Sequence, residues 1–152
     1  MISGVENPVD SAQLCAFWVG AEEYALDIMR VEEILQPLKS TPVPNAPDFV
    51  EGVLSLRGQI LPVVDLHRRL GSGVPPPRAK PKLLVCRVGR RQVALRVDGV
   101  SEVVRVHRRD IKPAPRFPGK GGAAYVVGVW GPPQRMKLLL DLKALLRAEA
   151  PS

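Results

Sequence analysis

Few residues in the chain have the type and spacing that catalysis requires. The two histidines, His67 and His107, each lie in a basic, turn-like context with no nearby nucleophile to activate. Asp65 and Asp141 each begin an Asp-Leu-x-x-x-Leu pattern, which the capping of a short helix explains. The sequence also lacks a glycine-rich phosphate loop and the GxSxG and HExxH motifs. We therefore expect that the protein is not an enzyme.

The two cysteines point to neither a metal site nor a disulfide. Cys15 and Cys86 lie within apolar stretches, and neither has a second cysteine or a histidine near it in the sequence. Buried free thiols are typical of such positions, and free thiols are typical of the cytosol. We expect no metal, no cofactor and a cytoplasmic location.

Arg57 is the residue best suited to binding a partner. It lies in the segment Phe49–Leu66, which reads F-V-E-G-V-L-S-L-R-G-Q-I-L-P-V-V-D-L. A guanidinium presents five donors in a rigid fork, which suits an acidic or carbonyl-rich surface. A local ion pair with Asp65, Glu51 or Glu33 is the alternative, and the two roles can coexist.

The composition favours a globular protein built from short strands. The chain has 152 residues, with 16 prolines, 13 glycines and only 5% aromatic residues, which favours short strands and turns over long helices. No apolar run approaches the ~20 residues of a membrane-spanning helix. The first residues, MISGVENPVDSAQ, do not look like a secretory signal. We therefore expect a protein that is not inserted in a membrane.

Charge is unevenly distributed along the chain. Residues 1–67 carry 3 basic and 10 acidic groups, whereas residues 68–120 carry 15 basic and 3 acidic groups. A basic segment of this kind suits nucleic acid, a membrane surface or an acidic protein. A basic β-barrel that binds nucleic acid is therefore an alternative function. Against this alternative, residues 68–120 contain a single aromatic residue, Phe117, that could stack on bases.

The chain contains an internal duplication. The offset that places Val19-Gly20 on Val88-Gly89 also aligns Val31 with Val100, Glu33 with Glu102, and Ile34-Leu35 with Val103-Val104. A slightly longer offset aligns Asp65-Leu66 with Asp141-Leu142. We assign residues 13–71 to the first copy and residues 82–147 to the second. The proline-rich residues 72–81 are predicted to form an extended, exposed spacer between them.

Arg57 has no counterpart in the second copy. Gly131-Pro132-Pro133-Gln134 replaces Ser55-Leu56-Arg57-Gly58 there. If Arg57 only supported the scaffold, both copies would need it. The difference therefore indicates a role for Arg57 that the second copy does not share.

Each copy is predicted to form about five short strands and a short terminal helix. The first two strands are expected at Leu14–Gly20 and Tyr24–Ile28, and at Leu83–Gly89 and Gln92–Asp98. Residues 31–38 have the apolar spacing of a helix that Pro37 ends early, whereas residues 100–106 are β-branched and should be extended. A hairpin at residues 52–66 should turn at Gly58. These elements predict two small β-barrels. Such barrels are compatible with an exchange of strands between the two lobes.

Several segments together resemble the CheW-like domain family. The pattern G-V-x-x-L-R-G-x-x-x-P-V-x-D-L, carried by residues 52–66, looks like the hallmark of this family. Further resemblance lies in Glu23–Ile28, Val31–Ile34, Val97–Val100, Ile111–Phe117 and Leu140–Leu142. The resemblance covers residues 13–147, nearly the whole chain.

The resemblance implies a mainly β fold with two SH3-like, five-stranded β-barrels and short helices. It also implies a non-catalytic adaptor in a bacterial chemosensory signalling array. Its partners would be the cytoplasmic tip of a methyl-accepting chemotaxis receptor and the regulatory domain of a CheA-type histidine kinase. The implied location is the cytoplasm, at receptor arrays near the inner membrane.

The resemblance also implies roles for particular residues. In this family the receptor tip lies in the groove between the barrels, near the arginine of the motif, which is Arg57 here. The residues implied to line or flank the same region are Val31, Glu33, Val100 and Val103. Phe117 matches an aromatic position implicated in contacts with the kinase and within the signalling ring.

Some features of the sequence leave alternatives open. Periodicity alone places Val103 in the hydrophobic core, and it leaves Val31 and Val100 between core and surface. Ser55 stands where the family commonly has asparagine before Leu-Arg-Gly. The arginine-rich second half is compatible with an accessory pathway, such as surface motility, or with an acidic receptor or kinase surface.

Overall fold

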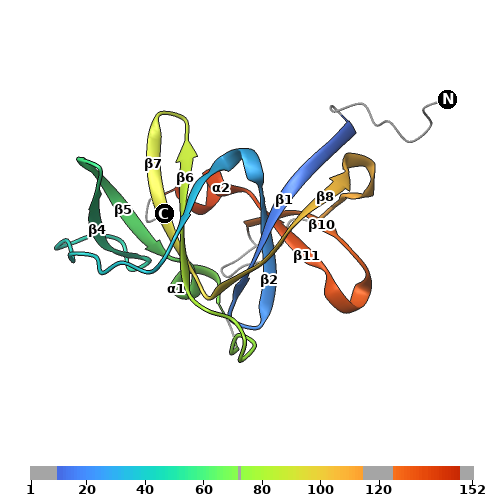
Figure 1. The fold of residues 1–152 in the computed structure, drawn as a ribbon, viewed down its shortest axis with the longest axis horizontal. Helices are drawn as coiled ribbons and strands as arrows, with labels where there is room; N and C mark the ends of the chain where they lie inside the picture. The colour runs from blue at the N-terminus through green and yellow to red at the C-terminus, as the bar shows by residue number, and fades with distance from the viewer. Residues whose placement is uncertain (1–9, 72, 115–124, 148–152) are drawn as a thin grey trace.

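The structure is a computed structural model that describes residues 10–71, 73–114 and 125–147. These residues form two β-sheets and a few short helices (Figure 1). The prediction of a mainly β fold is confirmed. Closure of the sheets into barrels stays a prediction.

The six-stranded sheet has the order β8-β1-β2-β11-β10-β9. Its strands are β1 (Ser11–Val19), β2 (Glu22–Asp27), β8 (Gly99–His107), β9 (Lys112–Pro113), β10 (Val126–Trp130) and β11 (Lys137–Leu140).

The five-stranded sheet has the order β3-β6-β7-β5-β4. Its strands are β3 (Val31–Leu35), β4 (Val50–Leu56), β5 (Gln59–Asp65), β6 (Lys82–Val88) and β7 (Arg91–Val97). An isolated bridge pairs Thr41 with Val53 of β4, so the segment after β3 returns to the opposite edge of the same sheet.

Short helices connect or follow the strands. Asp65 accepts hydrogen bonds from two backbone N–H groups at the start of α1 (Leu66–Leu70), and Asp141 accepts one at the start of α2 (Leu142–Leu145). Both aspartates therefore cap helices, as their position in the repeat predicts. Single turns of 3-10 helix form η2 (Ile28–Arg30), η3 (Arg108–Asp110) and η5 (Pro133–Arg135).

Neither sheet is built from one copy of the duplicated sequence. The first two strands of the N-terminal half pair with strands of the C-terminal half, and β6 and β7 pair with strands of the N-terminal half. The five-strand order β3-β6-β7-β5-β4 has its counterpart in β8-β1-β2-β11-β10. The two copies thus exchange their first two strands.

The exchange of strands mixes the charges that are separated in the sequence. Residues 31–98, which contain the five-stranded sheet, carry 11 basic and 6 acidic groups, and the rest of the chain carries 11 and 9. Ion pairs join the halves, as between Arg96 and Glu51 at 2.6 Å and between Arg87 and Glu32 at 2.7 Å. The strongly basic second half of the sequence therefore does not form a strongly basic lobe.

The hydrophobic core of the described residues has three clusters. The largest contains residues from both sheets and both α-helices, among them Phe17, Leu84, Leu66 and Leu142, so it joins the two lobes. A second cluster lies within the five-stranded sheet and a third within the six-stranded sheet. The large shared cluster is the structure that fixes one lobe against the other.

The helix predicted at residues 31–38 is wrong, because Val31–Leu35 form strand β3. The ladder with β6 shifts by one residue between Val31 and Glu33, which marks a β-bulge. A bulge breaks the two-residue alternation of a strand and leaves a spacing that imitates a helix. The extended conformation of residues 100–106 agrees with β8.

Residues 73–81 contain no strand. Six of the nine are exposed, as predicted, and Pro75, Pro76 and Ala79 are half-buried. The backbone N–H of Ala79 donates to the carbonyl of Pro76 at 2.9 Å, which closes a turn. A Cβ added at Gly73 would lie 2.9 Å from the Cβ of Ala21, and one at Gly99 would lie 2.9 Å from that of Ala79. The spacer therefore packs against the six-stranded lobe instead of extending freely.

Candidate functional site

Arg57 occupies the tight turn between β4 and β5. Leu56 pairs with Gln59 across this turn, and both residues between them have positive φ, +50° at Arg57 and +80° at Gly58. Such a turn favours asparagine and glycine, because other side chains are strained in the left-handed region. A strained arginine at this position points to a function for its side chain.

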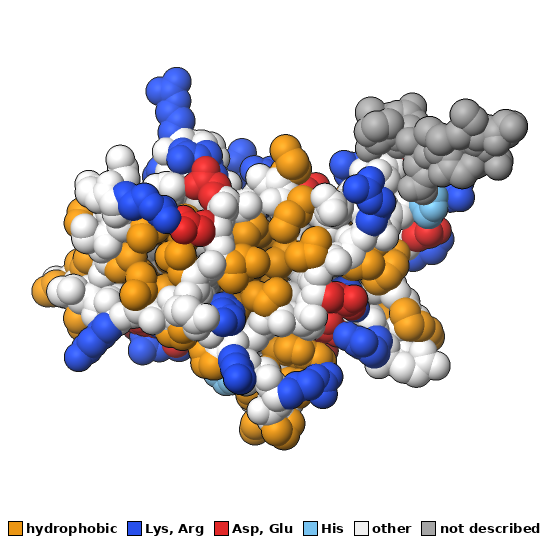
Figure 2. Space-filling view, in the orientation of Figure 1, with side chains coloured by type: hydrophobic (Ala, Val, Ile, Leu, Met, Phe, Trp, Pro, Cys, Tyr) orange, Lys and Arg blue, Asp and Glu red, His pale blue; other side chains and the backbone are white. Residues whose placement is uncertain are grey.

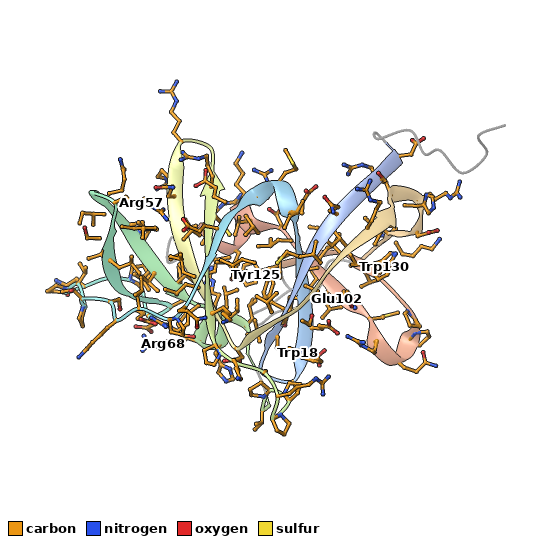
Figure 3. All side chains as sticks on the ribbon, in the orientation of Figure 1. Trp18, Arg57, Arg68, Glu102, Tyr125 and Trp130 are labelled. Atoms are coloured by element: carbon orange, nitrogen blue, oxygen red, sulfur yellow. The ribbon has the colours of Figure 1, made fainter. Side chains whose placement is uncertain are left out.

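The Arg57 guanidinium binds the Glu33 carboxylate in β3. Nη1 and Nη2 of Arg57 donate to the two carboxylate oxygens at 2.7 and 2.5 Å. This hydrogen bonding lowers the pKa of Glu33 below its usual value, so the carboxylate is charged at neutral pH. The side chain of Arg57 nevertheless stays 67% exposed (Figure 3). The predicted local ion pair thus exists, and its arginine remains open to a partner.

The other two carboxylates considered for Arg57 have different partners. Glu51 accepts hydrogen bonds from Arg96 and Ser40. Asp65 caps α1 and lies 3.5 Å from the guanidinium of Arg68. Glu33 is therefore the carboxylate to which the structure joins Arg57.

Val31 and Val100 hold equivalent positions on the two lobes. Both are half-buried and pack against the cluster that joins the sheets. Val31 pairs with Cys86 in one ladder and Val100 pairs with Phe17 in the other, and the offset that aligns the valines also aligns Phe17 with Cys86. The register shifts occur at equivalent positions in the two ladders. Residues that the duplication aligns in the sequence therefore also hold equivalent positions in the structure.

The placement of Val103 in the core is wrong. Its side chain is 49% exposed on β8, opposite Cys15 of β1. Its counterpart on β3, Ile34, is 42% exposed and pairs with Leu84. The bulges in both ladders turn these two aliphatic residues outward.

We name the residues of these two strands the β3–β8 face: Val31, Glu33 and Ile34 with Val100, Glu102 and Val103. Ile34 and Glu102 were missed as site residues in the sequence, although the internal duplication aligns them with Val103 and Glu33. In the view of Figure 2, hydrophobic side chains occupy the centre of the surface, and charged side chains of both signs lie to either side. Half-buried valines and exposed aliphatic side chains are suited to packing against a helix.

Glu102 also receives cations from the hairpin of its own lobe. Nζ of Lys137 lies 2.8 Å and Nη2 of Arg135 lies 3.7 Å from Oε2 of Glu102. Both cations also lie within 3.5 Å of buried Glu23, which accepts a hydrogen bond from Ser101 at 2.6 Å. In each lobe, therefore, the glutamate of the edge strand pairs with a cation from a hairpin. The aligned sequence has no counterpart of Arg57, but the second lobe still has such a pair.

His67 is joined to a carboxylate rather than to a nucleophile. Its Nδ1 lies 3.0 Å from Oδ2 of Asp98, and the same oxygen accepts a hydrogen bond from the Gly20 backbone N–H at 2.6 Å. This contact ties α1 to the β1–β2 turn. Among the described residues, no group of three or more His, Cys, Asp or Glu is arranged to hold a metal ion. Phe117 lies outside the described residues.

A broad hollow lies between the β4–β5 hairpin, the β6–β7 turn and α2. Its volume is about 1140 Å³, and Phe49, Val88 and Leu146 contribute to its apolar lining. Ile60, beside the Arg57 turn, is 67% exposed at this hollow. Among the lining residues that the structure describes, the charged ones are all basic: Arg87, Arg90, Arg91, Lys143 and Arg147. This surface shares no lining residue with the β3–β8 face, although its Arg87 binds Glu32 of β3, and it combines apolar and positively charged groups.

Comparisons with known proteins agree on one family. The family model described as CheW-like domain matches residues 13–150. A chemotaxis protein CheW of Rhizobium meliloti (strain 1021) is 38% identical over 90% of this chain and 88% of its own, and one of Klebsiella aerogenes is 36% identical over 97% and 89%. The crystal structure of the scaffolding protein TtCheW from Thermoanaerobacter tengcongensis superposes with a TM-score of 0.80 at 29% identity, over 91% of this chain and 89% of that one.

Proposed function

This chain belongs to the CheW-like domain family, and we propose on that basis that it is a non-catalytic adaptor of a bacterial chemosensory array. It couples methyl-accepting chemotaxis receptors to a CheA-type histidine kinase. Its mechanism is positional, because holding both partners lets a small receptor movement bias the kinase. Such coupling is typically worth ~1–3 kcal/mol.

The β3–β8 face is the proposed receptor surface. The observation that carries this proposal is the pairing of an exposed, strained Arg57 with Glu33, beside half-buried valines that rest on the joint of the two lobes. A helical receptor tip would pack on Val31, Val100 and Val103. Arg57 would fix its register through the donors that Glu33 does not use.

The kinase regulatory domain needs a different surface if both partners bind at once. The hollow beside Ile60 supplies one, because exposed apolar groups rimmed by cations suit a protein interface with acidic groups. Phe117 remains a proposed ring contact. The proposed location is the cytoplasm, at receptor arrays near the inner membrane. Among the described residues, no helix is long and apolar enough to cross a membrane.

Nucleic-acid binding is the weaker candidate. It rested on the basic residues 68–120, and exchange of strands distributes those cations over both lobes and pairs Arg87 and Arg96 with carboxylates. A stacking platform would also need several aromatic residues, which residues 68–120 lack.

The test is binding of the full chain to two partners from one organism: a receptor cytoplasmic fragment and the kinase regulatory domain. Wild type should bind both. Arg57→Asn removes the guanidinium, and asparagine tolerates the positive φ of this position. The variant should weaken receptor binding at least about fivefold and leave kinase binding unchanged.

Two control variants separate a binding role from local structure. Glu33→Gln breaks the ion pair but keeps Arg57, so it should retain more receptor binding than Arg57→Asn. Arg78→Gln removes one exposed positive charge in the spacer and should bind like wild type. Failure of wild type to bind either partner would contradict the adaptor role.

A further inference from the structure

We propose that Arg135, which donates to Glu23 and lies 3.7 Å from Glu102, is a second polar anchor of the β3–β8 face, at the opposite end from Arg57 and Glu33. This inference rests on the proposed function and deepens it, because both anchors would hold the same receptor tip. The partner it implies is a pair of antiparallel helices, with an apolar middle and acidic or carbonyl groups towards both ends.

The first support is the matching register of the two strands. Glu33 of β3 pairs with Val85 of β6, and Glu102 of β8 pairs with Ala16 of β1. The offset that aligns the two glutamates in the sequence also aligns Ala16 with Val85. The two glutamates therefore hold equivalent places in equivalent ladders.

The second support is similar exposure at each pair of positions. The side chains of Glu33 and Glu102 are 29% and 39% exposed, and those of Arg57 and Arg135 are 67% and 55% exposed. The exposed aliphatic residues that follow the glutamates, Ile34 and Val103, also match. Each lobe therefore carries the same exposed groups on or beside its edge strand: a carboxylate, an arginine and an aliphatic side chain.

The third support is the hydrogen-bonding capacity of Arg135. Its contacts with Glu23 and Glu102 within the described residues run through Nη2, at 3.3 to 3.7 Å. A guanidinium has five N–H donors, so Nη1 and Nε remain available for acceptors on a partner. The carboxylates restrict the orientation of the side chain and reduce the entropy that binding would cost.

The fourth support is the arrangement of charge around the apolar centre. In Figure 3, Arg57 lies on one side of the molecule and Glu102 lies beyond the centre on the other lobe. Figure 2, in the same orientation, shows hydrophobic side chains between the two charged regions. Antiparallel helices are related by an approximate two-fold axis, and the exchanged, duplicated strands offer a surface with the same approximate symmetry.

The experiment measures the Kd of the receptor cytoplasmic fragment for the full chain. The variants are Arg57→Asn, Arg135→Gln and both together, with Arg78→Gln as a control for lost charge. Arg135→Gln should raise the Kd at least about fivefold. The double variant should multiply the two single effects, since distant contacts act independently.

Structural damage at Arg135 must be separated from a lost contact, because the residue also faces buried Glu23. Arg135→Lys keeps a cation near both carboxylates but loses the planar fork. If Arg135 is an anchor, Arg135→Lys should weaken receptor binding, while its kinase binding and its melting temperature equal those of the Arg78→Gln control. Arg135→Gln removes one of the two cations that balance Glu23 and Glu102, so it should also lower the melting temperature. Equal losses of receptor and kinase binding would assign Arg135 a structural role and overturn the inference.

Two outcomes separate this inference from the proposed function. If Arg57→Asn weakens receptor binding and Arg135→Gln does not, the second anchor is refuted and the adaptor role stands. If wild type binds no receptor fragment at all, the adaptor role fails, and the inference fails with it.

Discussion

Replacing Lys137 by methionine should destabilise the protein strongly, because Lys137 compensates a buried carboxylate. The lysine is 3% exposed, and its Nζ lies 2.8 Å from Glu102 and 3.5 Å from buried Glu23. It also lies 5.7 Å from the ring of Trp130. Together with Arg135, it balances two carboxylates with two cations. Methionine has a similar length but leaves this cluster with one excess negative charge.

The size of the effect follows from the burial of Glu23. Removing one partner of a buried ion pair typically costs about 3–5 kcal/mol, because the other charge stays in a medium that solvates it poorly. For a domain of this size, that loss lowers the melting temperature by roughly 6–20 °C. It would also remove a large share of the ~5–15 kcal/mol that stabilises a typical domain.

A second variant tests charge compensation directly. Lys137→Met combined with Glu23→Gln removes one charge of each sign, and glutamine can still accept the hydrogen bond from Ser101. This pair should recover at least half of the lost unfolding free energy, measured by urea denaturation at pH 7. A loss below about 1 kcal/mol in the single variant, or no recovery in the double variant, would refute charge compensation.

The dependence of stability on pH gives an independent readout of the same cluster. Hydrogen bonding to Lys137 lowers the pKa of Glu102 below its usual value of 4.5. The native carboxylate therefore contributes stability that is present above pH 4.5 and is lost as pH falls through its lowered pKa. Lys137→Met should make the fall in unfolding free energy between pH 5 and pH 3 shallower.

Three further predictions concern the lobe joint, a glycine of β4 and the thiols. Arg69→Ala should cost about 2 kcal/mol in thermal unfolding, because the guanidinium lies 4.0 and 4.8 Å from two aromatic rings and donates to the carbonyls of Leu145, the last residue of α2, and Arg147; unchanged stability would contradict this. Gly52→Ala should destabilise the protein by about 2 kcal/mol, since the new Cβ would lie 2.3 Å from a backbone carbonyl oxygen. Gly58→Ala meets no atom within 4 Å and should cost only about 1 kcal/mol of backbone strain. Equal costs of the two variants in urea denaturation would refute the distinction. Burial raises the pKa of Cys15 to about 11 and that of Cys86 to about 12, so neither thiol should react with a disulfide reagent at pH 8 until urea unfolds the chain; rapid labelling of the native protein would show otherwise.

Local chemistry made several features readable from the sequence. The helix caps at Asp65 and Asp141, the hairpin turn at Gly58 and the β-branched strand at residues 100–106 depend on neighbouring residues, and each occurs as predicted. The motif around Arg57 also sufficed to indicate the family. These features are encoded within a few residues, so no knowledge of distant contacts is needed.

Other features depend on which strands become neighbours. The bulges that make residues 31–35 a strand and expose Val103 form only against β6 and β1, from distant parts of the chain. The separation of charge along the sequence likewise disappears in the fold, because acidic strands of one copy pair with basic strands of the other.

Except for β3, the sequence by itself determined the main elements, and it also determined the duplication and the family, because turns, caps and most of the periodicity are properties of short segments. Only the tertiary structure decided that the copies exchange strands, that Lys137 is buried between two glutamates and that Arg135 reaches the counterpart of Glu33. The physical reason is that pairing, burial and charge compensation depend on the free energy of the assembled sheets. Residues aligned by the duplication, such as Glu33 and Glu102, become equivalent only when both ladders have formed.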